Sequence, residues 1–142
     1  MKKVIFIGKT GSGKTTLSQM MNKTDLEYKK TQAVEFYDNI IDTPGEYIEN
    51  RVYYRALIIT AAEADVIALV YDCTQEEGYI PPNFASIFSK EVIGIITKID
   101  LAKDKEQVKR AREQLEAAGA TKIFEVSSVK NIGIEDMLNY LR

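Results

Sequence analysis

The feature that most constrains this chain is a short apolar run followed at once by a polar, glycine-rich loop. Val4–Ile7 reads VIFI, and Gly8–Thr16 reads GKTGSGKTT. An apolar run of this length that ends in turn residues is typical of a buried strand. Gly8–Thr15 matches G-x-x-x-x-G-K-T, a loop whose backbone N–H groups surround phosphate oxygens before a helix begins. The sequence therefore predicts a strand, a phosphate-binding loop (P-loop) and a helix N-terminus, in that order.

Within the P-loop, each position has an expected part in binding a nucleotide. Lys14 would reach the β- and γ-phosphates and act in catalysis, and the hydroxyl of Thr15 would ligate Mg²⁺. The start of the helix adds a partial positive charge. A glycine-rich turn with an incidental lysine is the alternative, which the position between strand and helix disfavours. The other predicted nucleotide-binding residues here are Gly8, Lys9, Thr10, Gly11, Ser12, Gly13 and Thr16.

Short apolar runs alternate with helical patterns along the 142 residues. This alternation predicts right-handed βαβ units in a single α/β domain over residues 1–142. We expect a three-layer P-loop NTPase fold, with a mainly parallel six-stranded sheet and helices on both faces. The predicted strands are Val4–Ile7, Val34–Tyr37, Asn39–Ile41 (with the preceding strand, a candidate hairpin), Val66–Tyr71, Val92–Thr97 and Lys122–Val126. The predicted helices are Thr15–Lys23, Arg51–Ala62, Asp104–Ala118 and Ile134–Leu141.

Composition excludes several classes of function. The net charge is −2 and there is no basic tail, which disfavours nucleic acid as a partner. The chain has no histidine and one cysteine, Cys73, so an internal disulfide, a zinc cluster and a histidine-based triad are excluded. A lone thiol fits a reducing compartment. The apolar runs are too short to span a bilayer, and we therefore expect a cytoplasmic protein without a membrane span.

A second motif, IIDTPGEY, covers Ile40–Tyr47. Two apolar residues followed by Asp at a strand end match the Walker-B arrangement, in which Asp42 would hold Mg²⁺. Gly45 would bring its backbone N–H against the γ-phosphate, because it has no side chain to prevent the approach. Asp, Pro and Gly also form ordinary turns, so a plain strand-to-turn segment is the alternative.

A third motif, IITKID, covers Ile95–Asp100 and points to the base. The Asp100 carboxylate would accept hydrogen bonds from N1–H and the 2-amino group of guanine, a donor pattern that adenine lacks. The stem of Lys98 would lie along the purine, and Thr97 completes the motif. A solvated Lys–Asp pair is the alternative interpretation. We therefore expect GTP or GDP with Mg²⁺, with ATP as the alternative nucleotide.

The segment after the last predicted strand carries a weaker signal. Ser127 and Ser128 would contact the guanine carbonyl through backbone N–H groups. Serine pairs are also common in loops, which leaves an ordinary connection as the alternative.

These four motifs, in this order, resemble those of the small Ras-like, translation-factor-class GTPases over nearly the whole chain. KTQAVEFYDNIIDTPGEY (Lys30–Tyr47) more particularly resembles the EutP/PduV family of ethanolamine- and propanediol-utilisation proteins. That resemblance implies a role beside bacterial microcompartments, and it carries both a GTPase-like and an acetate-kinase activity. It also implies that Thr31 is a catalytic, Mg²⁺-binding threonine of switch I (Asn22–Val34), with switch II running from Gly45 to about Arg55.

Three positions depart from the pattern of these GTPases. Glu46 stands where Ras-type proteins have a water-positioning glutamine. A carboxylate accepts but does not donate hydrogen bonds, so we expect slow hydrolysis. Thr97 replaces the usual asparagine, which predicts a weakened link to the P-loop and modest guanine affinity. Gly11 replaces the asparagine of potassium-activated members, so we expect no potassium dependence.

Three functions remain open at this stage. The first is a GTP-binding switch that hydrolyses GTP slowly and is read by an effector or microcompartment protein. The second is a phosphotransferase that uses ATP and acetate, for which the sequence shows no motif of a small-carboxylate pocket. The third is a non-catalytic nucleotide-binding module that targets or organises a microcompartment.

Overall fold

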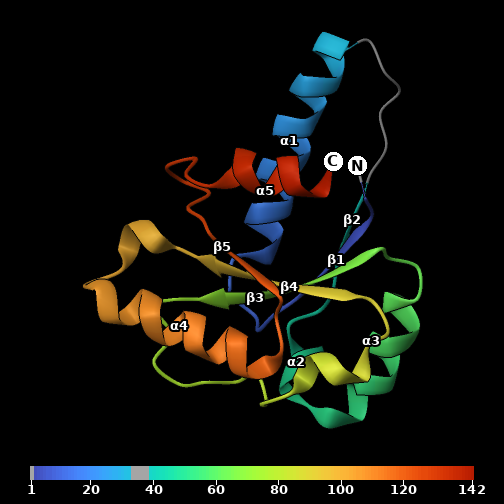
Figure 1. Ribbon diagram of the computed structural model, residues 1–142, viewed down its shortest axis with the longest axis vertical. Coiled ribbons are helices and arrows are strands. Elements are labelled where there is room, and N and C mark those ends of the chain that lie inside the picture. Colours follow the sequence, from blue (N-terminus) through green and yellow to red (C-terminus); the bar gives the residue numbers. More distant parts are fainter. Residues whose placement is uncertain (1, 33–38) are drawn as a thin grey trace.

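The computed structural model describes residues 2–32 and 39–142, and the side chains of residues 24–38 lie outside the described part. Its described residues form an α/β domain in which helices lie on both faces of a sheet (Figure 1). The elements follow in the order β1 (Val4–Ile7), α1 (Lys14–Gln32), β2 (Ile40–Asp42), α2 (Glu46–Glu49), η1 (Arg51–Tyr53), α3 (Tyr54–Ala61), β3 (Val66–Asp72), η2 (Phe84–Ile87), β4 (Glu91–Thr97), η3 (Ile99–Leu101), α4 (Lys105–Ala118), β5 (Lys122–Glu125) and α5 (Ile134–Leu141), where η marks a 3₁₀ helix.

The sheet has the strand order β2-β1-β3-β4-β5, and every neighbouring pair is parallel. It holds five strands in the described residues, one fewer than the six predicted. The predicted strand at residues 34–37, and with it the candidate hairpin to β2, lies outside the described residues. The register sets Asp72 at the end of β3 beside Thr97 at the end of β4.

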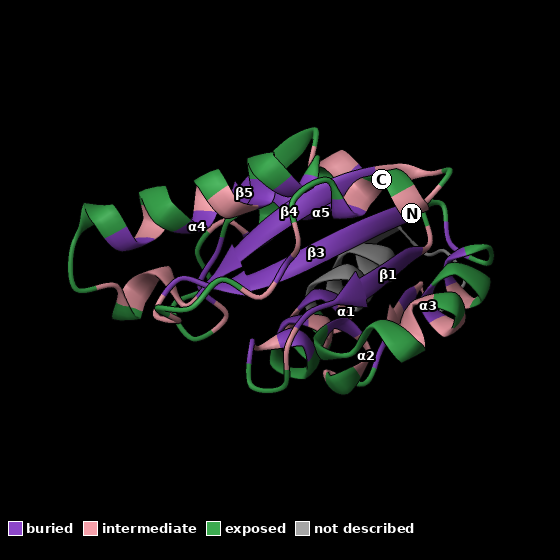
Figure 2. Ribbon diagram, turned by 90° about the horizontal axis from the view of Figure 1, so that it is seen from below, coloured by how far each residue is buried: buried purple, intermediate pink, exposed green. Residues whose placement is uncertain are grey.

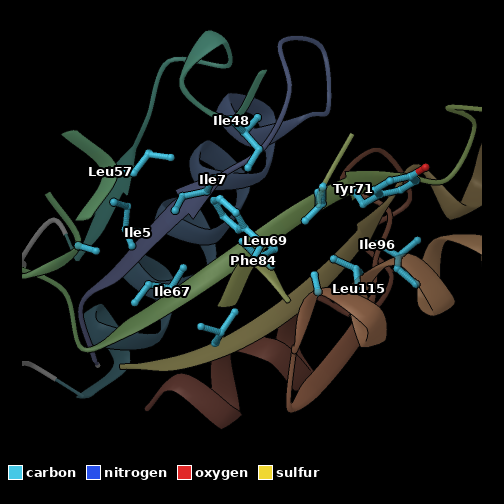
Figure 3. Packing of buried hydrophobic residues seen from close by; sticks show 14 of the residues in the cluster. Ile5, Ile7, Ile48, Leu57, Ile67, Leu69, Tyr71, Phe84, Ile96 and Leu115 are labelled. Carbon is cyan, nitrogen blue, oxygen red and sulfur yellow. The ribbon is translucent and has the colours of Figure 1, made fainter. Parts of the chain in front are cut away.

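Two hydrophobic layers hold the helices against the sheet. On one face, α1 and α5 pack through residues such as Leu17 and Met137. On the other, α2, α3 and α4 pack over a second cluster, shown in Figure 3 with Leu57 and Leu115. Successive strand residues face opposite layers, which is why all four residues of β1 are buried. Figure 2 shows the consequence, with the central strands β1, β3 and β4 buried and the outer helix faces exposed.

Helix α1 is longer than predicted. We expected a helix at 15–23, but it continues to Gln32. The sequence from Lys14 to Gln32 contains no proline and no glycine, and helix-forming Lys, Glu, Leu, Gln and Met are frequent in it. The predicted switch I segment therefore overlaps this helix. Thr31 belongs to α1 by its backbone, and its side chain lies outside the described residues.

Local signals set the ends of α4. The Asp104 carboxylate accepts a hydrogen bond from the backbone N–H of Gln107 at 3.2 Å, as an N-cap does. Gly119 ends the helix with a φ of 105°, a left-handed conformation that suits glycine. The predicted helix at 104–118 is thus confirmed with its caps.

The connection from β3 to β4, residues 73–90, contains only the short η2 as a helix. Most parallel strands are joined through a longer helix. Here the connection is held to α4 instead, because the backbone N–H of Asn83 donates to the carbonyl oxygen of Ala117 at 2.8 Å.

The two edges of the sheet, where the strands begin and where they end, differ in role. All five strands point the same way, so the loops that follow them meet at one edge of the sheet. At the opposite edge, the backbone N–H of Lys2 donates to the carbonyl oxygen of Leu141 at 2.8 Å, which sets the two ends of the chain side by side (Figure 1). No helix among the described residues has the length and apolar character needed to cross a bilayer.

Candidate functional site

A cavity of about 530 Å³ lies at the carboxyl edge of the sheet. This volume is in the range of small-molecule sites. Its walls come from the P-loop, from the segment after β2 and from the end of β4. The lining residues are Thr10, Gly11, Gly13, Lys14, Thr15, Thr16, Asp42, Thr43, Pro44, Gly45 and Lys98.

The P-loop has the conformation that its glycines permit. Gly11 and Gly13 have φ angles of 84° and 95°, in the left-handed region where a side chain would be strained. A turn is closed by the backbone N–H of Ser12, which donates to the carbonyl oxygen of Lys9 at 3.0 Å. Together these features wrap the backbone before α1, as an anion-binding loop requires.

Lys14 is the buried cation of the cavity. Its side chain is almost fully covered, and Nζ donates to the carbonyl oxygen of Lys9 at 3.4 Å. Burial lowers the pKa of Lys14 from 10.5, while the carboxylates of Asp42 and Glu49 act in the opposite direction. Negative charge therefore favours the ammonium form of Lys14, as a bound phosphate would. Our sequence analysis did not identify the influence of Glu49, because it depends on where α2 lies in the fold.

Thr15 and Asp42 meet at the mouth of the cavity. The Thr15 hydroxyl donates to Oδ2 of Asp42 at 2.7 Å, and both side chains are exposed. A hydroxyl and a carboxylate are hard oxygen ligands of the kind Mg²⁺ uses at nucleotide sites, where waters and phosphates supply the rest. The donor set therefore suits Mg²⁺.

Gly45 lies directly against the P-loop. A Cβ atom at this position would overlap the backbone nitrogen and the hydroxyl of Thr10. Thr43 holds the turn that contains Gly45 against β1, because its buried hydroxyl donates to the carbonyl oxygen of Phe6 at 2.6 Å. Glu46, the first residue of α2, is exposed and does not line the cavity.

The third motif, Ile95–Asp100, is joined to the P-loop at two points. The Thr97 hydroxyl donates to the carbonyl oxygen of Ser12 at 2.6 Å. Lys98, in a left-handed conformation with φ of 61°, donates from Nζ to the carbonyl oxygen of Gly11 at 2.8 Å. We expected threonine to weaken the link to the P-loop, and the structure shows that its hydroxyl makes a direct one.

Asp72 completes this junction and was missed in our sequence analysis. Its Oδ2 lies 2.9 Å from Nζ of Lys98, and its Oδ1 accepts from the backbone N–H and the hydroxyl of Thr74. The carboxylate is almost fully buried, whereas the Lys98 side chain is partly exposed. A carboxylate at the end of a buried strand next to the P-loop strand was the available signal. Beside it, burial raises the pKa of the Cys73 thiol to about 11, which leaves this cysteine unreactive.

Other predicted nucleotide-binding residues lie outside the cavity. Asp100 is a half-buried residue of η3, two positions after the cavity residue Lys98. Ser127 is fully buried, and its backbone N–H already donates to the carbonyl oxygen of Ile132 at 3.0 Å. Ser128 therefore has the freer backbone for the predicted contact. Gly8, Lys9 and Ser12 belong to the P-loop without lining the cavity.

Comparison with known proteins gives the chain a family context. Residues 1–142 match the family described as "Ethanolamine utilisation - propanediol utilisation". "Propanediol utilization protein PduV" of Citrobacter freundii is 41% identical over 141 residues, which cover 99% of this chain and 93% of that protein. "Probable acetate kinase EutP" of Escherichia coli (strain K12) is 34% identical over 143 residues, with 99% and 89% covered.

A solved structure supports the fold. Translation elongation factor SelB from Methanococcus maripaludis, determined with the GTP analogue GppNHp, superposes with a TM-score of 0.67 at 19% identity. The match covers 99% of this chain and 32% of that one. The likeness shows a shared fold, a parallel sheet covered by helices as in P-loop GTPases.

Proposed function

Because this chain belongs to the PduV–EutP family of ethanolamine and propanediol utilisation, we propose that it is a Mg²⁺-dependent GTP-binding protein of such a pathway, with slow GTP hydrolysis. One observation carries the proposal. Thr97 and Lys98 both bond to carbonyl oxygens of the P-loop, so the TKID motif is fixed relative to the phosphate cavity. This arrangement supports a purine bound beside Lys98 and Asp100, with its phosphates in the P-loop.

The residues of the cavity have distinct parts in this proposal. Lys14 and the backbone N–H groups of the P-loop stabilise negative charge on the phosphates before and during transfer to water. Thr15 and Asp42 would hold Mg²⁺, which would neutralise negative charge on the phosphates. Thr31 follows Thr15 on the same helix at a distance of about 24 Å along its axis, so it would join the ion only if the end of α1 unwound. Gly45 offers its N–H to the γ-phosphate. Hydrolysis is slow because the exposed Glu46 carboxylate only accepts hydrogen bonds and has no side-chain donor to orient the attacking water.

The comparisons favour one second candidate, because relatives carry the name "Probable acetate kinase". In that reaction the γ-phosphoryl group of ATP would pass to a carboxylate oxygen of acetate, giving acetyl phosphate and ADP. The same P-loop and Mg²⁺ site would serve it. Asp100 argues against it, since a carboxylate at the base favours guanine over adenine.

The biological setting is part of the proposal. We place the protein in the cytoplasm, associated with a bacterial microcompartment or with an effector that recognises its nucleotide-bound form. The segments that would report the nucleotide are Gly45 with α2, and the part of α1 that includes Thr31.

Nucleotide affinity tests the proposal directly. GDP, GTP, ADP and ATP are titrated with Mg²⁺ against the wild type, Asp100→Asn and Asp104→Asn. The last is a matched control, because asparagine still caps α4. We expect guanine preference in the wild type and in the control, and its loss in Asp100→Asn. Xanthosine triphosphate is the positive control for that variant, since its 2-oxo group accepts from an asparagine amide.

Either main outcome leads to a definite next step. Guanine preference that depends on Asp100 supports the GTP-binding protein. ATP preference unaffected by Asp100→Asn would contradict it, and acetate phosphorylation would then be assayed.

The hydrolysis rate is tested separately. Glu46→Gln supplies a side-chain donor next to the cavity residue Gly45 and removes a negative charge, so we expect its GTP turnover to exceed that of the wild type. Glu63→Gln, another exposed glutamate, is the control. A fast wild-type rate that Glu46→Ala abolishes would refute slow hydrolysis and show that Glu46 is a catalytic residue.

A further inference from the structure

Tyr79 is a chemically distinctive residue outside the cavity lining. It lies in the connection between β3 and β4, and its neighbours fix this segment in place. Ile80 and Phe84 are buried in the hydrophobic cluster, with 4% and 3% of their surfaces exposed. The bond from Asn83 to the Ala117 carbonyl holds the connection to α4. A long loop without these anchors would leave the tyrosine free to move.

The phenol of Tyr79 is directed at the end of β3. Its hydroxyl donates to the carbonyl oxygen of Val70 at 2.5 Å. Its ring stacks on that of Tyr71, with centroids 5.1 Å apart and planes inclined by 2°. The buried Tyr71 ring thus supports the partly buried ring of Tyr79, and both contacts determine the position of the Tyr79 hydroxyl.

The same phenol is next to the P-loop. Nζ of Lys9 lies 6.0 Å from the centroid of the Tyr79 ring. Burial raises the pKa of Tyr79, and the backbone of Lys9 acts in the opposite direction. The Lys9 side chain therefore lies over the Tyr79 ring.

The Val70 carbonyl connects the phenol to the first P-loop residue. A Cβ atom on Gly8 would lie 2.6 Å from this oxygen, so the backbone of Gly8 rests on it. The carbonyl that receives the Tyr79 hydrogen bond is thus the surface against which the P-loop begins. Gly8 and Lys9 are supported from outside the cavity by one side chain and the strand end that it holds.

We propose that Tyr79 is a positioning residue of the phosphate-binding loop, which holds Gly8 and Lys9 in the conformation that the loop needs before a nucleotide arrives. Its effect on nucleotide affinity rests on the proposed function. Phosphate-binding N–H groups act best when they need no reorganisation, so a support behind the loop raises affinity without touching the ligand.

Tyr79→Phe tests the proposal, with Tyr71→Phe as the matched control. The Tyr71 hydroxyl contacts the carbonyl oxygens of Glu77 and Gln75 within the connection, at 3.3 and 3.5 Å. Each variant therefore removes one hydroxyl from the same stacked pair, and only Tyr79→Phe removes the bond to Val70. Two quantities are measured: amide hydrogen exchange of residues 8–13 without nucleotide, and the affinity for Mg²⁺ with GDP and with GTP.

We expect Tyr79→Phe to speed amide exchange at Lys9 and its neighbours. The affinity for GDP and for GTP should fall about fivefold to tenfold, as loss of one hydrogen bond does. Tyr71→Phe should change neither. The proposal would be overturned if amide exchange in Tyr79→Phe equalled that of the wild type, or if the two variants changed amide exchange equally. If the wild type bound no nucleotide, the proposed function would fail, and the exchange comparison would still decide the role of Tyr79.

Discussion

The Thr97 hydroxyl donates to the Ser12 carbonyl oxygen across 85 residues of sequence. Both residues are buried, with 4% and 2% of their surfaces exposed. Ser12 takes part through its backbone, because its own buried hydroxyl has no hydrogen-bond partner among the described residues. One side-chain hydroxyl therefore connects the Ile95–Asp100 motif to the middle of the P-loop.

Thr97→Ala should weaken nucleotide binding and destabilise the fold. The Ser12 carbonyl would lose this partner in a buried place, which costs about 1–2 kcal/mol of unfolding free energy. We also expect nucleotide affinity to fall by up to roughly tenfold, because a P-loop without this bond is less well preorganised. Fluorescent nucleotide titration and chemical denaturation measure the two effects. Thr97→Ser keeps the hydroxyl and should bind like the wild type, and Ser12→Ala should be close to neutral. Unchanged affinity in Thr97→Ala would show that the bond does not position the loop.

Asp72→Asn should speed nucleotide release. The change removes the negative charge 2.9 Å from Nζ of Lys98, so the ammonium group keeps the Gly11 carbonyl as its remaining partner. We expect a dissociation rate about two- to fivefold higher, since Lys98 is partly exposed and solvent screens the pair. Stopped-flow displacement measures the rate. Glu125→Gln breaks an exposed pair with Arg112 instead and should leave the rate unaltered.

Gly45→Ala should impair the triphosphate-bound state. The added methyl group would collide with the backbone and side chain of Thr10, which cannot move without distorting the P-loop. We expect GTP affinity and hydrolysis to fall more than GDP affinity, because Gly45 is proposed to meet the γ-phosphate. Gly78→Ala is the control, since its methyl group would meet only the end of the flexible Gln114 side chain. Equal loss of GDP and GTP binding would instead indicate general damage to the loop.

Lys14→Met should abolish nucleotide binding while stabilising the nucleotide-free protein. Burial disfavours the charged lysine, so removing the charge should add about 1 kcal/mol to the unfolding free energy near neutral pH. The lowered pKa gives a pH signature. Above the folded-state pKa, the native protein carries fewer protons than the unfolded chain, whose lysine titrates near 10.5. The unfolding free energy of the wild type therefore rises with pH between the folded-state pKa of Lys14 and its unfolded value of 10.5.

Thermal unfolding measured between about pH 7 and about pH 10 checks this dependence. The difference in stability between Lys14→Met and the wild type should become smaller as pH rises. A constant difference would mean that packing, and not charge, separates the two proteins.

The sequence predicts those parts of the fold that depend on neighbouring residues. Val4–Ile7 is buried on both faces as its unbroken apolar run indicates, and α4 begins and ends at its caps. The P-loop is also local, because its glycines and Lys14 follow one another along the chain. The order of the motifs at strand ends then predicts which loops share an edge of a parallel sheet.

Other features depend on the register and could not be derived from local pattern. Asp72 reaches Lys98 because β3 and β4 align Asp72 with Thr97, and no short motif carries that information. Tyr79 reaches the P-loop through a connection that lacks a regular pattern. Helix α1 continues past its predicted end at Lys23 because the apolar pattern stops there, whereas residues with good helix propensity continue to Gln32.

The hydrogen bond between Lys2 and Leu141 has a practical consequence for engineering. Both ends of the domain emerge at the amino edge of the sheet, whereas the cavity lies at the carboxyl edge. A dye, an affinity handle or a fused carrier attached at either end would leave the cavity accessible. A short linker that joins the two ends would also permit circular permutants, with new openings in exposed turns such as the one around Lys103.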